Sequence, residues 1–255
     1  MTPSAQATPA MVALFVSDLH LDAALPRTTA RFLRFLEEIA PSAQALYLLG
    51  DVFEYWAGDD DLDNAFNRRI VTALHALGQR GVDLFWIAGN RDFLVGEHFA
   101  QEAGMRLLDD PTVLTRNGQR IVLTHGDMLC TDDHAYQAFR AQVRDPAWQQ
   151  QFLSQALSER KRIIEAMRQH SREAQQVKAP EIMDVNEAAV LGLFAQEGAS
   201  VMIHGHTHRP AVHRYAQGLV RHVLPDWELD HGPLRGGWLQ LDDAGLLTAV
   251  SATHA

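Results

Sequence analysis

The sequence MVALFVSDLH at residues 11–20 places an Asp-x-His triplet directly after an apolar run. Every residue from Met11 to Val16 is apolar, which is typical of a strand that is buried on both faces. Similar runs lie at 45–49, 83–88, 120–124 and 200–204. Stretches with helical spacing, such as 28–39 and 64–80, lie between them, and this alternation predicts an α/β fold.

Each of these apolar runs is followed by polar residues that are able to bind a metal ion. In chain order the motifs are Asp18-Leu19-His20, Gly50-Asp51, Gly89-Asn90-Arg91-Asp92, His125-Gly126-Asp127 and Gly205-His206-Thr207-His208. Any one of them alone is more typical of an ordinary turn. Because ligands of open α/β sheets bind at the carboxyl ends of strands, the whole set indicates a single crevice. Two carboxylates, one amide and four imidazoles exceed the needs of one ion, so we expect a dinuclear site for Mn²⁺, Fe²⁺ or Zn²⁺.

Composition excludes several classes of protein. The 255 residues are 47% hydrophobic, enough for a sizeable core, and the single cysteine excludes an intrachain disulfide and favours a reducing compartment. The formal charge of −10 disfavours nucleic acid as a partner. The longest apolar run, at residues 10–16, is too short to span a bilayer, so we expect a cytoplasmic protein.

Residues 133–180, here called the lid segment, show helical spacing and no strand pattern. Residues 134–180 carry eight basic and four acidic residues within an acidic chain. We expect a helical insertion over an anionic, apolar ligand; the alternative is a helical hairpin that packs an apolar stripe on the core. The core then comprises residues 11–132 and 181–255, with short strands at 220–224, 237–241 and 247–250. Residues 1–10 are expected to form a disordered extension.

The ordered motifs resemble those of the calcineurin-like metallophosphoesterase superfamily. The resemblance implies a β-sandwich flanked by helices, with two metal ions close together. Its implied metal ligands are Asp18, His20 and His208 for one ion, Asn90, His125 and His206 for the other, and Asp51 as the bridge. The residues implied for catalysis are Asp51, Asn90, Arg91 and His125. Two ions so placed can activate a water molecule and clamp phosphoryl oxygens, so no protein nucleophile is needed.

Longer stretches resemble one family within the superfamily, the UDP-2,3-diacylglucosamine hydrolases of lipid A biosynthesis. These stretches are residues 17–21, 50–54, 89–94, 125–127 with 129–133, 182–186 and 204–210. The resemblance implies two Mn²⁺ ions and hydrolysis of a pyrophosphate bond to give UMP and 2,3-diacylglucosamine 1-phosphate (lipid X). The implied substrate contacts are Asn90, Arg91, Asp133, Ser171, Gln175, Lys178 and His206, although the family often has asparagine where Gln175 stands. Asp133 could instead cap a helix, and Lys178 could be a solvated lysine.

Arg91 departs from the wider superfamily, many of whose members have histidine after the motif asparagine. Histidine can protonate an alkoxide leaving group, whereas a departing phosphate monoester has a second pKa of about 6 and needs no proton. An arginine that neutralises phosphate charge suits that reaction better. We therefore interpret Arg91 as selecting pyrophosphate over phosphomonoester chemistry.

A substrate with two acyl chains indicates that the protein acts at a membrane surface. Basic lid residues such as Arg160, Lys161 and Arg162 could attract anionic lipid, so we expect peripheral association with the cytoplasmic face of the inner membrane. Candidates for an acyl chamber are Tyr136, Phe139, Trp148, Phe152, Ile163 and Met167, each of which could equally pack in the core. Glu54 and Asp59 to Asp61 are expected to form a solvated acidic loop, and His204 to support a strand end.

Two alternatives remain open. One is a pyrophosphatase or phosphodiesterase of the same superfamily that acts on a soluble nucleotide. The other is a binding scaffold that has kept the fold and lost catalysis, and such a protein should lack one or more of the metal ligands.

Overall fold

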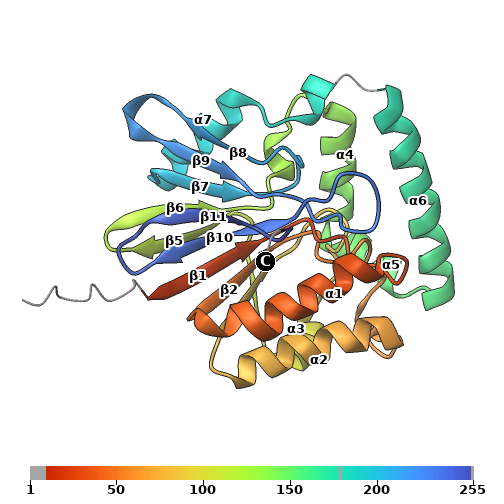
Figure 1. The fold of residues 1–255 in the computed structure, drawn as a ribbon. Coiled ribbons are helices and arrows are strands. Elements are labelled where there is room, and N and C mark those ends of the chain that lie inside the picture. Colours follow the sequence, from red (N-terminus) through yellow and green to blue (C-terminus); the bar gives the residue numbers. More distant parts are fainter. Residues whose placement is uncertain (1–9, 178–179, 254–255) are drawn as a thin grey trace, which may run out of the picture.

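A sandwich of two β-sheets forms the centre of the protein (Figure 1). The computed structural model describes residues 10–177 and 180–253, with side chains outside 170–181. The first sheet has the order β11-β10-β1-β2-β3-β4 and the second the order β5-β6-β7-β9-β8. Strands β1 to β4 run parallel, as do β6, β7 and β9, while β5, β8, β10 and β11 pair antiparallel with their neighbours.

The strands of the first sheet are β1 (Met11–Val16), β2 (Ala45–Leu49), β3 (Asp83–Ile87), β4 (Arg106–Leu108), β10 (Gly237–Asp242) and β11 (Leu247–Ser251). Those of the second sheet are β5 (Thr112–Arg116), β6 (Gln119–Leu123), β7 (Val201–His204), β8 (Ala211–Arg214) and β9 (Val220–Val223). Strands β1 to β3 carry continuous apolar runs because both of their faces are buried.

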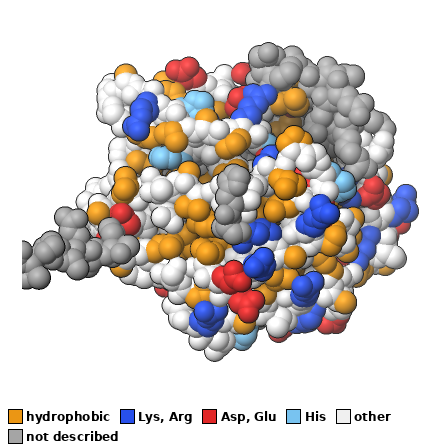
Figure 2. All heavy atoms as spheres, viewed as in Figure 1, with side chains coloured by type: hydrophobic (Ala, Val, Ile, Leu, Met, Phe, Trp, Pro, Cys, Tyr) orange, Lys and Arg blue, Asp and Glu red, His pale blue; other side chains and the backbone are white. Residues whose placement is uncertain are grey.

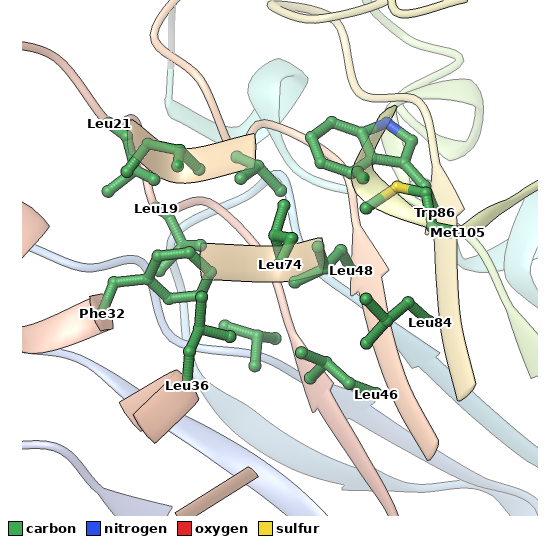
Figure 3. Close-up of a cluster of buried hydrophobic side chains, with 14 of the residues drawn as sticks. Leu19, Leu21, Phe32, Leu36, Leu46, Leu48, Leu74, Leu84, Trp86 and Met105 are labelled. Atoms are coloured by element: carbon green, nitrogen blue, oxygen red, sulfur yellow. The ribbon is translucent and has the colours of Figure 1, made fainter. Parts of the chain in front are cut away.

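Alternate side chains of these strands enter two different cores. Phe15 and Tyr47 point to the layer between the sheets, where they meet Ile121 and Ile203 of the second sheet. The intervening residues, among them Leu46 and Leu48, point to the opposite face and pack against helices, as Figure 3 shows. The first sheet therefore lies between a sheet and a helical layer.

Helices cover the outer faces of both sheets. The first sheet is covered by α1 (Pro26–Arg34), which continues into a π-helical turn (Phe35–Ile39), and by α2 (Ala65–Gln79) and α3 (Glu97–Ala103). Helix α7 (Glu187–Glu197) packs on the second sheet through Val190, Leu193 and Phe194. Short 3₁₀ turns lie at Ala40–Ser42, Asp59–Asp61, Asp127–Leu129, Pro180–Met183 and Ala216–Gly218.

The lid segment forms three helices, α4 (His134–Val143), α5 (Pro146–Leu153) and α6 (Leu157–Val177). Figure 1 shows α4 and α6 beside the carboxyl ends of the sandwich strands. None of the described helices is long and apolar enough to cross a membrane. Apart from Ala10, the expected N-terminal extension lies outside the described residues.

Candidate metal centre

The polar motifs all follow strand ends, and hydrogen bonds between backbone atoms tie the loops that carry them together. The Asp18 N–H donates to the Gly50 carbonyl at 3.0 Å, and the His20 N–H donates to the Asp51 carbonyl at 2.9 Å. The Gly205 N–H donates to the His125 carbonyl, also at 3.0 Å. The His206 N–H donates to Oδ2 of Asp18 at 2.9 Å, so loops from both sheets converge at one place.

One group of possible metal donors consists of Asp18, His20 and His208, whose ligand atoms lie within 4.8 Å of one another. The Nε2 atoms of the two histidines are 3.2 Å apart. The Nε2 of His208 also lies 3.5 Å from Oδ1 of Asp18. A cation placed among these atoms would have one carboxylate and two imidazoles as ligands.

A second group consists of Asp18, Asp51 and His125, again within 4.8 Å. Asn90 joins it, because its Oδ1 lies 3.0 Å from Nε2 of His125 and 2.8 Å from Nδ1 of His206. The Asp51 carboxylate lies between the groups, with Oδ2 at 4.0 Å from Nε2 of His20 and Oδ1 at 3.7 Å from Nε2 of His125. The structure thus brings all seven predicted ligands together, with the Asp51 carboxylate between the two groups.

The outer nitrogen of two of these imidazoles already has a partner. Nδ1 of His125 lies 2.9 Å from the Leu49 carbonyl, to which it donates. Nδ1 of His20 lies 2.8 Å from Oε2 of Glu54. Partners of this kind fix the ring and leave Nε2 free for a metal, as is usual for metal-binding histidines.

The backbone of the donor residues is held in a conformation that L-residues rarely adopt. Left-handed conformations, with φ between 48° and 67°, occur at Asp18, His20, Asp51, His206 and His208. Each costs on the order of 1–3 kcal/mol and persists only where the surroundings impose it. The hydrogen bonds between the loops supply that constraint here.

Glycines allow the loops to approach so closely. A Cβ added to Gly50 would lie 2.6 Å from both the Gly89 Cα and Nδ1 of His125. A Cβ added to Gly205 would lie 2.7 Å from the Ser17 Cβ and closer still to the Ser17 hydroxyl and the Asp18 carboxylate. The glycines of the motifs therefore provide space as well as turns.

The electrostatic field of the site favours one positive charge at His125. Burial by itself would lower the pKa of His125, but the Asp51 and Asp18 carboxylates outweigh it and raise the pKa to about 9. Burial, together with the charge on His125, lowers the pKa of the neighbouring His206 to about 4. Buried carboxylates that attract positive charge, surrounded by imidazole and amide donors, fit a pair of divalent cations.

Asp92 belongs to the motif Gly89-Asn90-Arg91-Asp92, and the sequence alone assigns it no role. Its buried carboxylate accepts the backbone N–H groups of Gly89 at 2.8 Å, Val52 at 2.7 Å and Asp51 at 3.2 Å. Burial and the Asp51 charge raise its pKa to about 6. Asp92 thus ties the loop after β3 to the loop after β2. Its position next to Asn90 and Arg91 is the one feature of the sequence that points to this role.

The predicted substrate residues fall into three classes. Asn90 and His206 lie within the donor cluster, and Arg91 follows directly, with its N–H donating to Oδ1 of Asp51 at 2.8 Å. Asp133 is buried and caps α4 by accepting the Tyr136 N–H at 3.1 Å, which is the alternative that the sequence left open. The remaining three, Ser171, Gln175 and Lys178, lie outside the residues whose side chains are described.

The expectation of a solvated acidic loop at Glu54 and Asp59 to Asp61 is wrong. These carboxylates bind the lid helix α6 and neighbouring groups of the core. Asp60 pairs with Arg160, Asp61 with Lys161 at 2.6 Å, and Glu54 with Arg168 at 2.8 Å. Asp59 accepts the Trp56 indole N–H at 3.0 Å and the Phe99 N–H at 2.9 Å, at the start of α3. The loop is therefore the docking surface for α6.

The basic side chains of the lid segment that the structure describes are likewise engaged within the chain. Arg140 pairs with Asp127 at 2.9 Å, and Arg144 donates to the Ala88 and Gly89 carbonyls, both at 2.9 Å. The Arg160 side chain is 1% exposed, so the expectation that it faces lipid is wrong, whereas Arg162 is 70% exposed and pairs with Glu159. On the face shown in Figure 2, basic side chains are interspersed with acidic and apolar ones.

Several apolar lid residues belong to the core. Phe152 is a buried member of the core cluster, and Trp148 and Ile163 pack against it. The Trp148 and Phe152 rings are stacked with centroids 4.9 Å apart. For these three candidates the packing alternative holds, while Phe139 and Met167 are half-buried.

Two further residues, His204 and Cys130, are buried. His204 is buried at the end of β7, with Nδ1 2.8 Å from the Gly205 carbonyl and Nε2 2.9 Å from a donating nitrogen of Arg221. Burial raises the pKa of the Cys130 thiol to about 12, which leaves it unreactive as a nucleophile.

Comparison with known proteins agrees with this geometry. The profile of the calcineurin-like phosphoesterase family matches residues 11–210 and confirms the expected fold class. The chain is 51% identical over 241 residues to the UDP-2,3-diacylglucosamine hydrolase of Aromatoleum aromaticum, covering 92% of this chain and 95% of that protein. It is 48% identical over 245 residues to the enzyme of that name from Stenotrophomonas maltophilia, covering 89% and 97%. The chain therefore belongs to the calcineurin-like phosphoesterases and, among them, to the family of the UDP-2,3-diacylglucosamine hydrolases.

Proposed function

We propose that the chain hydrolyses the pyrophosphate bond of UDP-2,3-diacylglucosamine, giving UMP and 2,3-diacylglucosamine 1-phosphate. One observation carries the proposal. The chain has a cluster of metal donors around Asp51, and its sequence is about half identical to hydrolases named for that substrate. The side chains of all seven expected ligands lie close together, which supports catalysis over a scaffold that has lost it.

We propose Mn²⁺ for both metal positions. Asp18, His20 and His208 would hold one ion, Asn90, His125 and His206 the other, and Asp51 both. When bound, such a pair lowers the pKa of a water molecule toward neutrality and neutralises charge on phosphoryl oxygens.

The chain's own residues would orient the substrate and stabilise its charge. Asn90 and Arg91 lie in the loop after β3. The hydrogen bond from the Arg91 N–H to the Asp51 carboxylate holds the backbone of Arg91 beside the donor cluster. A guanidinium there would neutralise a phosphate in the transition state. Because the leaving group is a phosphate monoester, it departs without a proton from the protein.

We propose that the lid segment covers a site formed by the core at residues 11–132 and 181–255. The Tyr136 ring of α4 stacks on the His206 ring with centroids 5.8 Å apart, which places α4 over the donor cluster. Phe139 and Met167 are our candidates for contact with the acyl chains. Asp133, Ser171, Gln175 and Lys178 are proposed to bind the rest of the substrate.

We also propose peripheral association with the cytoplasmic face of the inner membrane, because a diacylated substrate resides there. The described lid cations are paired within the chain, so acyl chains entering the site would contribute more to binding than surface charge. Sedimentation with anionic vesicles, with and without the lipid substrate, tests this. Binding that needs substrate and tolerates salt supports it, and no binding in either case overturns it.

The substrate assignment is tested with a panel of three phosphates. Manganese-loaded protein is incubated in ¹⁸O-water with UDP-2,3-diacylglucosamine, UDP-N-acetylglucosamine and an aryl phosphate. We expect rapid hydrolysis of the first only, with the label in UMP. Equal or faster hydrolysis of a substrate without acyl chains would instead support a soluble nucleotide as the substrate.

A further inference from the structure

Glu54 lies between a predicted metal ligand and the lid helix α6. One carboxylate oxygen, Oε2, is 2.8 Å from Nδ1 of His20, and the other, Oε1, is 2.8 Å from a guanidinium nitrogen of Arg168. We propose that Glu54 is a positioning residue for His20 and that Arg168 fixes Glu54, so that the seating of α6 is coupled to the metal centre. This inference rests on the proposed function for the identity of the centre.

The backbone holds Glu54 beside His20 independently of the side chains. The Glu54 N–H donates to the Leu21 carbonyl at 3.2 Å, and the Leu21 N–H donates to the Val52 carbonyl at 2.8 Å. Leu21 and Phe53 form an isolated parallel β-bridge. The loop after β1 and the loop after β2 are thus in fixed register, so the Glu54 carboxylate can move away from His20 only by rotation of its side chain, which the bond to Arg168 opposes.

The three side chains are largely shielded from water. The exposed fractions are 15% for His20, 20% for Glu54 and 17% for Arg168. Hydrogen bonds between partly buried charged groups are worth more than exposed ones, and loss of one partner leaves the other poorly solvated. Removal of the Arg168 side chain would therefore leave the Glu54 carboxylate with one hydrogen-bond partner fewer, although the two residues lie 114 positions apart in the chain.

The contact with His20 has a specific chemical consequence. Because Nδ1 donates to Glu54, the lone pair of Nε2 is directed toward Asp51 and His208, where a cation would bind. Without the carboxylate the ring is free to rotate and to change tautomer, which weakens it as a ligand. Glu54 thus prepares His20 for metal binding without touching the metal itself.

Arg168 is the lid cation through which this effect reaches α6. It also pairs with Glu165 on its own helix and lies over the Tyr55 ring at 5.4 Å. Arg160 and Lys161 hold the amino-terminal half of α6 to Asp60 and Asp61, which do not contact a predicted ligand in the described contacts. A helix that shifts over the substrate would therefore change the metal centre at His20 first.

The experiment is a Mn²⁺ titration of metal-free protein, followed by calorimetry and by electron paramagnetic resonance, with no substrate present. The variants are Glu54→Gln, Arg168→Gln and the double variant. The matched control is Arg162→Gln, which removes an exposed cation from the same helix. We expect Glu54→Gln to weaken one of the two equivalents by about 10- to 100-fold, as is typical for partners of metal-binding histidines.

We expect Arg168→Gln to weaken the same equivalent by a smaller factor and Arg162→Gln to change nothing. The double variant should bind like Glu54→Gln alone, because Arg168 acts through Glu54. Additive losses, or an Arg168→Gln variant that binds like Arg162→Gln, overturn the coupling. Arg168→Lys, which keeps the charge, should recover part of the loss.

Folding and substrate identity are controlled separately. Thermal unfolding of each metal-free variant shows whether the fold survives, and if Glu54→Gln unfolds, the Arg168→Gln and Arg168→Lys pair decides. A protein that shows the expected titration but does not hydrolyse the diacylated sugar nucleotide refutes the proposed substrate alone. A protein that hydrolyses it with unchanged Mn²⁺ affinity in the variants refutes only the coupling.

Discussion

The substitution Gly205→Ala adds one methyl group at the point where the loop after β7 meets the loop after β1. The new carbon would lie 2.7 Å from the Ser17 Cβ and would overlap the Ser17 hydroxyl and the Asp18 carboxylate. The φ angle of Gly205 is not in the left-handed region, so the effect is one of space. The methyl group can be accommodated only if one loop moves away from the other.

That movement has a calculable cost. The Asp18 carboxylate accepts the His206 N–H at 2.9 Å and the Ser17 hydroxyl at 2.6 Å, and a shift of the loop breaks the first of these bonds. A hydrogen bond to a charged group is worth about 1.5–3 kcal/mol. At about 1.4 kcal/mol for each factor of ten, Mn²⁺ affinity should fall by about 10- to 100-fold.

Calorimetric Mn²⁺ titration measures this loss, with turnover of the diacylated sugar nucleotide as a second readout. The control is Gly192→Ala on α7, where an added Cβ meets nothing within 4 Å. Alanine in a helix interior is favoured over glycine by about 0.5–1 kcal/mol, so this control should be slightly more stable and fully active. A Gly205→Ala protein that binds Mn²⁺ as tightly as the control would refute the close contact between the loops.

Four further predictions have definite expected outcomes. Asp51→Ala should reduce bound manganese from two equivalents to at most one and abolish turnover, as measured by metal analysis and a product assay. Arg91→His should lose more activity on the sugar nucleotide diphosphate than on an aryl phosphate, and equal losses on both would reject a selective role. Cys130 should resist alkylation through pH 9, because its pKa of about 12 keeps the thiol protonated until the pH approaches that value; rapid alkylation below pH 9 with retained fold would contradict its burial. Lys161→Met should increase hydrogen exchange in α6 by removing the partner of buried Asp61, while Arg162→Met should not.

The sequence allowed the central strands to be located because they are buried on both faces. The predicted runs at 11–16, 45–49 and 83–88 agree with β1, β2 and β3 to within one residue. The strands that were missed, β4, β5 and β8, all lie at sheet edges. Edge strands need no continuous apolar pattern, and every residue of β8 is exposed. The short helix α3 was missed because seven residues give too few turns for a periodic pattern.

The metal centre was predictable for a different reason. Parallel strands end at the same edge of a sheet, so motifs that follow such strands converge whatever the intervening sequence. The partners of the charged lid residues were not predictable, because a sequence gives the sign of a charge and not its neighbour. Glu54 and Arg168 illustrate the point, since nothing local to either residue indicates the other.

Each of the two groups of donors takes residues from both sheets of the sandwich. Asp18, Asp51 and Asn90 follow strands of the first sheet, while His125, His206 and His208 follow strands of the second. The metal centre therefore lies at the junction of the two sheets. The apolar layer that includes Phe15 and Ile203 sets the separation of the sheets and so the distance between the two sets of ligands. A cavity made in that layer, far from any charged atom, would be transmitted to the cations as a misalignment of one half of their ligands against the other.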